Sequence, residues 1–189
     1  MNVLIRTLQG AVLTLGLFWG VALGHSGSGS EVLPVVSEEM EGFRRQQGVL
    51  FRFGQPLTGI LLHSTDGTTV WTPYVDGRTH GMEIGRHADG TKAFERIWSE
   101  GLRQGTALFW WPDGTLREQT SYRDDIPEGL SERWFADGTP AQRFHYRDGQ
   151  EEGLQMMWYE DGTIRAAYEV RSGRRYGTNG TKGCTTTTD

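Results

Sequence analysis

The sequence predicts an all-β fold, a single-layer antiparallel β-meander of tandem β-hairpins. Asp-Gly pairs recur with their glycines at positions 90, 114, 138 and 162, so the step between units is 24 residues. Two further columns keep the same phase. One consists of glycines, Gly81, Gly105, Gly129 and Gly153, and the other consists of rings, Tyr74, Trp98, Tyr122 and Tyr146, continued by Val170. A fixed period of this size indicates a repeat architecture.

Each unit has the composition of one hairpin. Residues 105–111 are rich in strand formers, the turn 112–114 reads Pro-Asp-Gly, and a second strand follows at 115–122. Pro at the second turn position presets φ, and Gly at the fourth accepts positive φ. A second type of turn, such as Asp148-Gly149, links one hairpin to the next. Asp125 replaces the glycine in one link, and since Asp tolerates the left-handed region at modest cost, we expect this link to be the least stable.

Side chains alternate between the two faces of a strand. We predict one apolar face, formed by the first, third and fifth positions after each leading glycine together with one row of the return strands. These residues are Met82, Thr106, Leu130, Leu154; Ile84, Leu108, Glu132, Met156; Arg86, Trp110, Trp134, Trp158; and Arg96, Thr120, Phe144, Tyr168. The other face is expected to be wet, with Arg117, Gln119, Arg143, Arg165 and Glu169.

The repeated residues resemble a known family. The pattern Gly-x-x-x-x-Trp-Tyr-x-Asp-Gly, clearest at residues 153–162, is similar to the bacterial variant of the MORN repeat, and the resemblance covers about residues 48–177. It implies a twisted β-meander with no active site, in a family whose members include scaffolds and antitoxins. Arg86, His87 and Asp125 depart from the pattern.

The N-terminal segment, residues 1–24, has the pattern of a signal peptide. Arg6 precedes an apolar run at 11–23, and Ala22 and Gly24 precede a cleavage point before His25. We therefore predict export to a periplasmic or extracellular location, with an uncleaved membrane anchor as the alternative.

The remaining segments frame the repeats. Residues 25–47 are predicted to be a linker in which Ser37 caps a short helix over the first strand edge. The repeat domain is expected at 48–177, with an opening strand at 50–53 and a shortened first hairpin, because Gly59 and Gly81 are 22 residues apart. Residues 178–189 are expected to form an irregular tail that covers the last strand edge.

Composition and motifs argue against several functions. With 19 basic and 24 acidic residues the net charge is −5, so no basic face for nucleic acid is expected. The Asp-Gly carboxylates lie at turn positions that Asp favours, one per hairpin, which does not gather them on a metal. We therefore expect no catalytic residue, cofactor or metal. Cys184 is the single cysteine, which excludes an internal disulfide and leaves a possible reactive thiol.

A row of rings before the turns is the candidate binding surface. Trp111, Phe135 and Tyr159, with His87 in the first unit, lie next to the Trp110 column and face the other way, so one of the two rows is on the wetter face. These rings either contact a partner or merely cover the hairpin ends. We expect a non-enzymatic scaffold for an unknown protein or cell-envelope component. The alternatives are a module at a membrane surface and an antitoxin or immunity-type protein.

Overall fold

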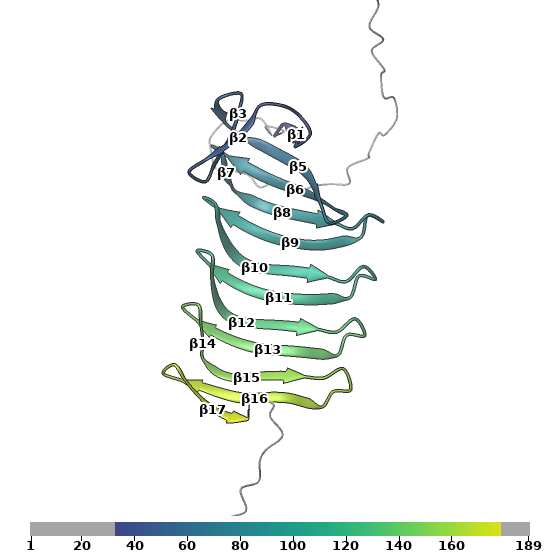
Figure 1. Ribbon diagram of the computed structural model, residues 1–189, viewed down its shortest axis with the longest axis vertical. Coiled ribbons are helices and arrows are strands. Elements are labelled where there is room, and N and C mark those ends of the chain that lie inside the picture. Colours follow the sequence, from purple (N-terminus) through teal and green to yellow (C-terminus); the bar gives the residue numbers. More distant parts are fainter. Residues whose placement is uncertain (1–32, 179–189) are drawn as a thin grey trace, which may run out of the picture. The chain divides into compact units, whose positions relative to one another are not determined.

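The computed structural model describes residues 33–178, and every regular element in this part of the chain is a β-strand (Figure 1). A 14-stranded sheet has the order β1-β5-β6-β8-β9-β10-β11-β12-β13-β15-β16-β17, with β7 on β6 and β14 on β13, and a three-stranded sheet has the order β2-β3-β4. The bounds are β1 Val35–Ser37, β2 Phe43–Gln46, β3 Val49–Arg52, β4 Gln55–Pro56, β5 Gly59–Thr65, β6 Thr68–Val75, β7 Arg78–Thr79, β8 Gly81–Arg86, β9 Lys92–Ser99, β10 Leu102–Trp110, β11 Leu116–Arg123, β12 Ile126–Trp134, β13 Pro140–Arg147, β14 Gln150–Glu151, β15 Gly153–Trp158, β16 Ile164–Arg171 and β17 Arg174–Thr178.

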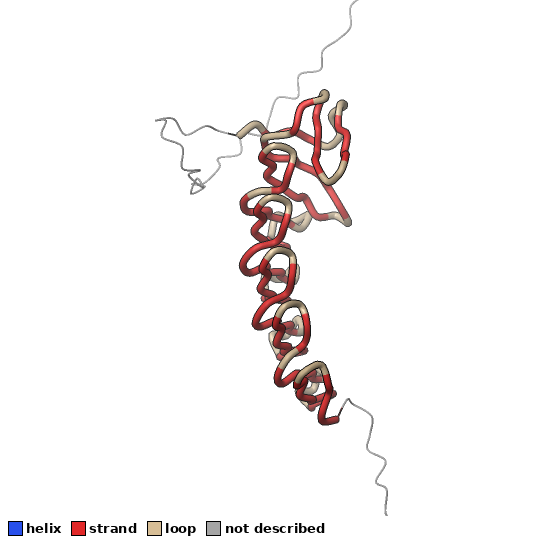
Figure 2. Tube along the Cα trace, turned by 90° about the vertical axis from the view of Figure 1, so that its left-hand side faces the viewer, coloured by secondary structure: helices blue, strands red, loops and turns tan. Residues whose placement is uncertain are grey.

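The large sheet is the predicted meander of sequential hairpins. All of its neighbouring pairs are antiparallel except β1 and β5, which are parallel. In the view turned by 90°, the hairpins between β8 and β17 follow one another as a single layer (Figure 2). The all-β meander predicted from the 24-residue period is confirmed.

The strand ends on one side of the sheet form what we call the Asp-Gly rim. There each hairpin closes through the Asp-Gly turn at residues 87–91, 111–115, 135–139 or 159–163. In the second of these turns, Trp111 N donates to Thr115 O (2.8 Å) and Gly114 N donates to Trp111 O (2.9 Å). The Asp113 Oδ1 atom accepts the N–H of Thr115 at 2.8 Å. The same contacts recur in the other three turns, where the threonine hydroxyl also donates to the carboxylate. The Asp residues therefore serve turn geometry, as predicted.

At the opposite edge, the link rim, consecutive hairpins are joined by two-residue turns with positive φ at both positions. The pairs are Asp76-Gly77, Glu100-Gly101, Asp124-Asp125 and Asp148-Gly149, and Asp125 adopts a φ of 70°. The second residue of each turn donates its N–H to a carbonyl of the preceding unit, from Gly77 to Leu57 (2.7 Å), Gly101 to Thr79 (2.9 Å), Asp125 to Arg103 (3.0 Å) and Gly149 to Pro127 (3.0 Å). Each hairpin is thus fastened to the one before it.

The ring column is aligned as predicted. Each member is the Cα partner of a leading glycine: Gly59 with Tyr74, Gly81 with Trp98, Gly105 with Tyr122, Gly129 with Tyr146, and Gly153 with Val170. Cα partners present their side chains on the same face of an antiparallel pair, so each ring lies beside a position without a side chain.

The predicted composition of the two faces is wrong. Thr120, Phe144 and Tyr168 pair with Ala107, Ser131 and Gln155, not with the Leu108 row, and all six residues are buried. We call this side, with Glu83, Arg96 and the ring column, the packed face. The Leu108 row instead shares the other side, the open face, with Gln119 and Arg143. Arg117, predicted to be on the wet face, lies 5.5 Å from the centroids of the Phe109 and Trp111 rings.

The open face therefore carries apolar side chains between polar ones such as Gln119 and Arg143. Its apolar residues are Met82, Ile84, Leu108, Leu130, Leu154 and Met156, with Trp110, Trp134 and Trp158 at its border, and all of them are exposed or half-buried. The buried positions of the packed face are mostly small or polar because the neighbouring rings cover them. Gln155, for example, is 0% exposed, and its amide donates to His145 O (3.1 Å) and Glu152 O (2.9 Å).

The N-terminal region differs from the predicted linker and capping helix. Ser37 ends strand β1, and a turn, not a helix, follows it. The strand β1 nevertheless covers the edge of β5, the role expected for the helix. The predicted opening strand is β3, which belongs to the small sheet β2-β3-β4. A core of Val36, Leu50, Leu57, Leu61 and Tyr74 joins this sheet to β5 and β6.

The first and last hairpins are the atypical ones. The hairpin β5–β6 closes with the two-residue turn Asp66-Gly67, which accounts for the shorter glycine step. At the other end, β17 pairs with β16 through the turn Ser172-Gly173. The predicted signal peptide, residues 25–32 of the linker and the tail from residue 179 lie outside the described residues.

Candidate functional site

The predicted binding residues line the Asp-Gly rim, one per hairpin. His87, Trp111 and Phe135 are half-buried and Tyr159 is 51% exposed. Each begins its turn, and the Trp111 indole N–H donates to the Trp134 carbonyl of the next hairpin at 3.2 Å. The structure thus brings these residues into one row, where they also cover the hairpin ends.

Trp111, Phe135 and Tyr159 are each preceded by a tryptophan at the border of the open face, whereas His87 is preceded by Arg86. The pairs are Trp110-Trp111, Trp134-Phe135 and Trp158-Tyr159, and none of the six rings is buried. The two rings of a pair have different neighbours, because Lys92 Nζ lies 4.8 Å from the Trp110 centroid while Arg117 lies beside Trp111. We call these six residues the aromatic border.

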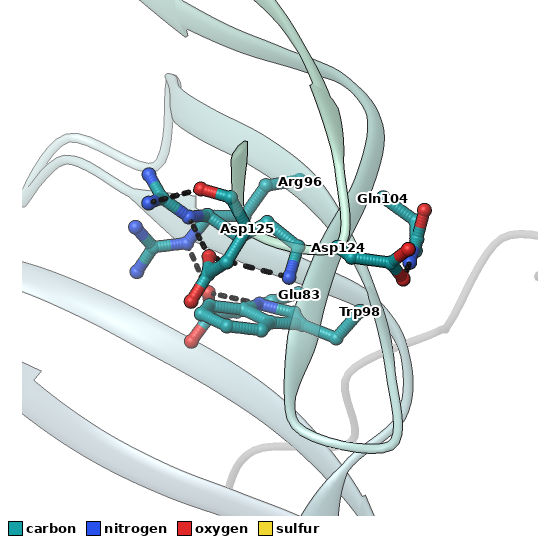
Figure 3. A network of polar contacts seen from close by, with 7 residues as sticks. Glu83, Arg96, Trp98, Gln104, Asp124 and Asp125 are labelled. Carbon is teal, nitrogen blue, oxygen red and sulfur yellow. Dashed lines mark hydrogen bonds and ion pairs between the residues drawn. The ribbon is translucent and has the colours of Figure 1, made fainter. Parts of the chain in front are cut away.

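A polar network that sequence reasoning missed lies on the packed face between β6, β8 and β9 (Figure 3). The Glu83 carboxylate accepts hydrogen bonds from the Thr72 hydroxyl (2.7 Å), the Trp98 indole N–H (2.9 Å) and the Arg96 guanidinium, with which it forms an ion pair. The Arg96 guanidinium also lies 5.4 Å from the Trp98 ring centroid. Glu83 is 4% exposed, and its charge is compensated within the network.

A second ion pair lies beside this network, at the link rim. Arg103 donates to the carboxylate of Asp125 and stacks 4.1 Å from the Tyr122 centroid. This hydrogen bond, together with the nearby charges of Arg103 and Arg96, lowers the pKa of the Asp125 carboxyl below its ordinary value. Gln104 Nε2 donates to Asp124 Oδ1 of the same turn at 2.5 Å (Figure 3). The one link without a glycine is therefore held by side-chain contacts.

A cleft of about 470 Å³ opens on the packed face next to Glu83. His63, Tyr74 and Trp98 line it, together with the carboxylates of Glu38, Glu83 and Asp125. Arg45 reaches over from β2 and donates to the Tyr74 hydroxyl at 3.2 Å. Glu83 and Asp125 are in ion pairs with Arg96 and Arg103, whereas Glu38, Arg45 and His63 are in none among the described residues. The cleft therefore offers polar contacts, and its lining contains Thr72 and Thr79 but no Ser, Cys or Lys.

The structure describes only some of the residues on which the other chemical predictions depend. Residues 33–178 contain no group of three or more His, Cys, Asp or Glu side chains placed to hold a metal ion. The same residues contain no helix long and apolar enough to cross a membrane. Cys184 lies outside the described residues. A signal for the Glu83 network was present in the sequence, because Glu83 and Arg96 are opposite charges where the next three units have Ala107 with Thr120, Ser131 with Phe144 and Gln155 with Tyr168.

Comparisons with known proteins give one family match and 24 similar chains among solved structures, of which two are described here. Residues 103–124 match the MORN repeat variant, and no curated protein matches the chain. A structure described as the crystal structure of TarM has a TM-score of 0.31 and 15% identity, over 52% of this chain and 20% of that one. One of accessory secretory proteins 1, 2 and 3 in Streptococcus pneumoniae has a TM-score of 0.16 and 13% identity, over 60% of this chain and 17% of that one.

The chain therefore spans about a fifth or less of each of these two structures. The matched segment coincides with the hairpin β10–β11, which closes with the Pro112-Asp113-Gly114 turn and ends at the Asp124-Asp125 link. The same two turns and the same ring-over-glycine pairing recur in the hairpins on both sides. Residues 103–124 are thus a MORN repeat variant, set in a β-sheet scaffold of similar hairpins.

Proposed function

We propose that this protein is an exported, non-enzymatic scaffold that binds another protein through one side of its extended sheet. The observation that carries the proposal is the aromatic border, six rings at one edge of three successive hairpins, none of them buried. Aromatic side chains supply a large share of the binding energy at protein interfaces, and partly exposed rows of them mark contact surfaces.

The open face supports the same surface. Its apolar rows lie next to the aromatic border, and Leu154 remains 52% exposed because no second layer covers β15 among the described residues. Protein interfaces combine apolar side chains of this kind with polar and charged ones, and on this face the ion pair Glu132–Arg143 lies among them. The hairpin period repeats the contact at every second strand, about 10 Å apart, so an elongated partner would meet several equivalent units.

The binding experiment compares capture by the wild-type protein and by the triple variant Trp111→Ala, Phe135→Ala, Tyr159→Ala. Both are immobilised and exposed to the native exported fraction, and captured proteins are quantified by mass spectrometry. We expect at least about a tenfold loss of the specific partner in the triple variant, equivalent to 1.4 kcal/mol or more. Since Trp111 also bonds to Trp134 O, circular dichroism must show that the variant remains folded.

The matched control is the variant Leu102→Ala, Ile126→Ala, which removes exposed apolar side chains from the link rim. It is expected to capture the partner as the wild type does. Unchanged capture by the folded triple variant would refute the aromatic border as the binding surface.

Export has its own test. It rests on the pattern of residues 1–24, so the protein isolated from its producing cells should begin at His25. Intact-mass measurement decides this, and a chain that retains residues 1–24 would support the membrane-anchored alternative.

A further inference from the structure

The ring pairs of the aromatic border follow one another along the Asp-Gly rim at a regular interval. Each of three successive hairpins contributes one pair, and neighbouring turns touch. The Thr91 hydroxyl donates to Pro112 O at 3.3 Å, and the Trp111 indole N–H donates to Trp134 O. The turns therefore lie one beside the next along the length of the sheet (Figure 1). Because neighbouring strands are about 4.8 Å apart and each hairpin has two strands, the interval between pairs is about 9.6 Å.

The tryptophan of each pair offers an apolar surface and a free hydrogen-bond donor. The Cα partners of Trp110, Trp134 and Trp158 are Leu116, Pro140 and Ile164. Within residues 33–178 none of these three indole N–H groups donates a hydrogen bond, whereas the indoles of Trp98 and Trp111 both do. An occupant that matches this surface presents an apolar group and a free acceptor once per hairpin.

The turns of the Asp-Gly rim are acidic. The four turns contain no lysine or arginine, and their five carboxylates are Asp89, Asp113, Asp137, Glu160 and Asp161. All five are exposed, and none is in an ion pair among the described residues. Hydrogen bonds from the following threonine lower the pKa of the four Asp carboxyls, so these groups are charged at neutral pH. An occupant with positive charge at the same interval is therefore favoured.

The first ring pair already holds cations that this chain supplies. Lys92 Nζ lies 4.8 Å from the Trp110 centroid, and the Arg117 guanidinium lies 5.5 Å from that of Trp111. Among the described residues no lysine or arginine lies over a ring of the next two pairs, Trp134-Phe135 and Trp158-Tyr159. Cations of an occupant, spaced by one hairpin, would make there the contact that Lys92 makes in the first unit.

Polyproline II is the regular peptide conformation that matches this interval. It has three residues per turn and rises about 3.1 Å per residue, so every third side chain returns to the same side after about 9.3 Å. Its carbonyls form no internal hydrogen bonds and are free to accept from the indoles. A β-strand returns to the same side after about 6.7 Å. An α-helix uses its carbonyls internally and leaves the indole N–H groups without an acceptor.

We propose that the aromatic border binds a proline-rich segment in the polyproline II conformation, with a lysine or arginine at every third residue. The prolines lie against the tryptophans, the carbonyls of the segment accept from the indole N–H groups, and its basic side chains lie beside the rim carboxylates. Three ring pairs span two intervals, which corresponds to about seven residues of the segment. This site rests on the function proposed above and gives its partner a chemistry.

The first test uses synthetic peptides and the protein as isolated from its producing cells. A fluorescein-labelled peptide of five Pro-Pro-Lys triplets is titrated, and its fluorescence anisotropy gives the Kd. In the first comparison peptide, Pro-Pro-Glu triplets reverse the charge. In the second, five Pro-Pro-Pro-Lys units keep the charge and lengthen the lysine interval to about 12.4 Å. We expect the Pro-Pro-Lys peptide to bind at least tenfold more tightly than either comparison peptide.

The second test changes the protein at the second ring pair. Trp134→Phe keeps a ring and removes the free indole N–H, and Trp134→Ala removes both. Trp134 O, which accepts from Trp111, is a backbone atom and remains in each variant. We expect binding of the Pro-Pro-Lys peptide to weaken at least threefold in Trp134→Phe and at least tenfold in Trp134→Ala, with circular dichroism confirming that both are folded.

The third test concerns the rim charges. The double variant Asp137→Asn, Asp161→Asn keeps an oxygen that accepts from the turn threonines and removes two charges. It should weaken binding at least threefold and reduce the salt dependence of the Kd. The matched control Asp148→Asn removes a charge from the link rim and should leave the Kd unchanged.

Three results would overturn this assignment. The first is equal affinity for the two lysine peptides, and the second is unchanged binding by folded Trp134→Ala. The third is equal weakening by Asp148→Asn, which would indicate attraction to an acidic protein in general. If the Pro-Pro-Lys peptide does not bind while the triple variant at Trp111, Phe135 and Tyr159 loses the native partner, the polyproline assignment fails and the scaffold function stands.

Discussion

Glu83 and Arg96 face each other across β8 and β9, and their ion pair takes the place that the next three hairpins fill with uncharged pairs. The pair lies on the packed face, where the Glu83 carboxylate also bonds to Thr72 and Trp98. One carboxylate therefore connects three strands, β6, β8 and β9, near the junction with the small sheet.

Removal of this carboxylate should destabilise the fold. Glu83→Ala leaves the Arg96 charge, the Trp98 indole N–H and the Thr72 hydroxyl without their shared acceptor, and we expect a loss of about 3 kcal/mol, the lower end for a broken buried pair because Arg96 is partly exposed. Urea denaturation followed by tryptophan fluorescence measures it. The control Glu95→Ala breaks the more exposed pair with Lys92 and should cost less than about 1 kcal/mol. Equal losses in the two variants would contradict the structural role of Glu83.

Gly77 should be irreplaceable where the small sheet meets the first link. Its φ is 76°, and an added Cβ would lie 2.4 Å from Val49 Cγ1 and 2.6 Å from Leu50 O. The same glycine donates to Leu57 O and accepts from Leu50 N, both at 2.7 Å. Gly77→Ala must therefore separate β3 from the large sheet, with an expected loss well above the 1–2 kcal/mol, roughly, of left-handed strain alone.

Gly173→Ala is the matched comparison for this substitution. Gly173 has a similar φ of 73°, but nothing lies within 4 Å of an added Cβ, so only the backbone strain is expected. Thermal unfolding of both variants, with proteolysis in the 38–58 region as a local readout, tests the difference. Similar midpoints for the two variants would show that the close approach at Gly77 does not matter.

Acid should weaken the fold through the turn carboxylates. Hydrogen bonds from the threonine two residues later lower the pKa of the carboxyls of Asp89, Asp113, Asp137 and Asp161, and Arg103 lowers that of Asp125. A carboxyl whose pKa is lower in the folded than in the unfolded state stabilises the fold at pH values above its unfolded pKa, 3.8. This stabilisation is lost as the pH falls through the folded pKa. We expect the urea midpoint to drop below about pH 4, and to drop less in Asp113→Asn. A midpoint that stays constant down to pH 2.5 would contradict this.

The 24-residue period predicted the hairpins correctly, whereas the hydrophobicity of the side chains assigned them to the wrong faces of the sheet. Glycine and Asp-Gly columns report local turn geometry, which a short sequence specifies, so both rims and the ring column are as expected. Burial depends on neighbours across strands. Ala107 and Ser131 are buried because rings and adjacent strands surround them, while the larger Leu108 and Leu130 remain partly exposed on an uncovered face. Side-chain polarity alone gives the opposite assignment.

The small sheet lies outside the repeat pattern, whereas the Glu83 network was marked within it by two charges at positions that are uncharged in the next three units. Residues 43–56 carry no 24-residue signal, and their place depends on the contact between Leu50 and Gly77, which only the folded chain creates. The sequence predicted Phe53 to be part of an opening strand. In the structure it lies in a turn, because β3 pairs with β4. Pairwise opposition of Glu83 and Arg96 was visible once the register was known, but composition gave no register.

The N–H of the second link residue, at positions 77, 101, 125 and 149, bonds to a carbonyl of the preceding unit, 20 to 22 residues earlier. Because these hydrogen bonds join only neighbouring units, the length of the sheet can change by whole 24-residue modules. Excision of one complete 24-residue module would shorten the reach of the sheet by about 10 Å and preserve every remaining junction. Duplication or deletion of a module during evolution would therefore change the distance between the two ends of the sheet in fixed steps.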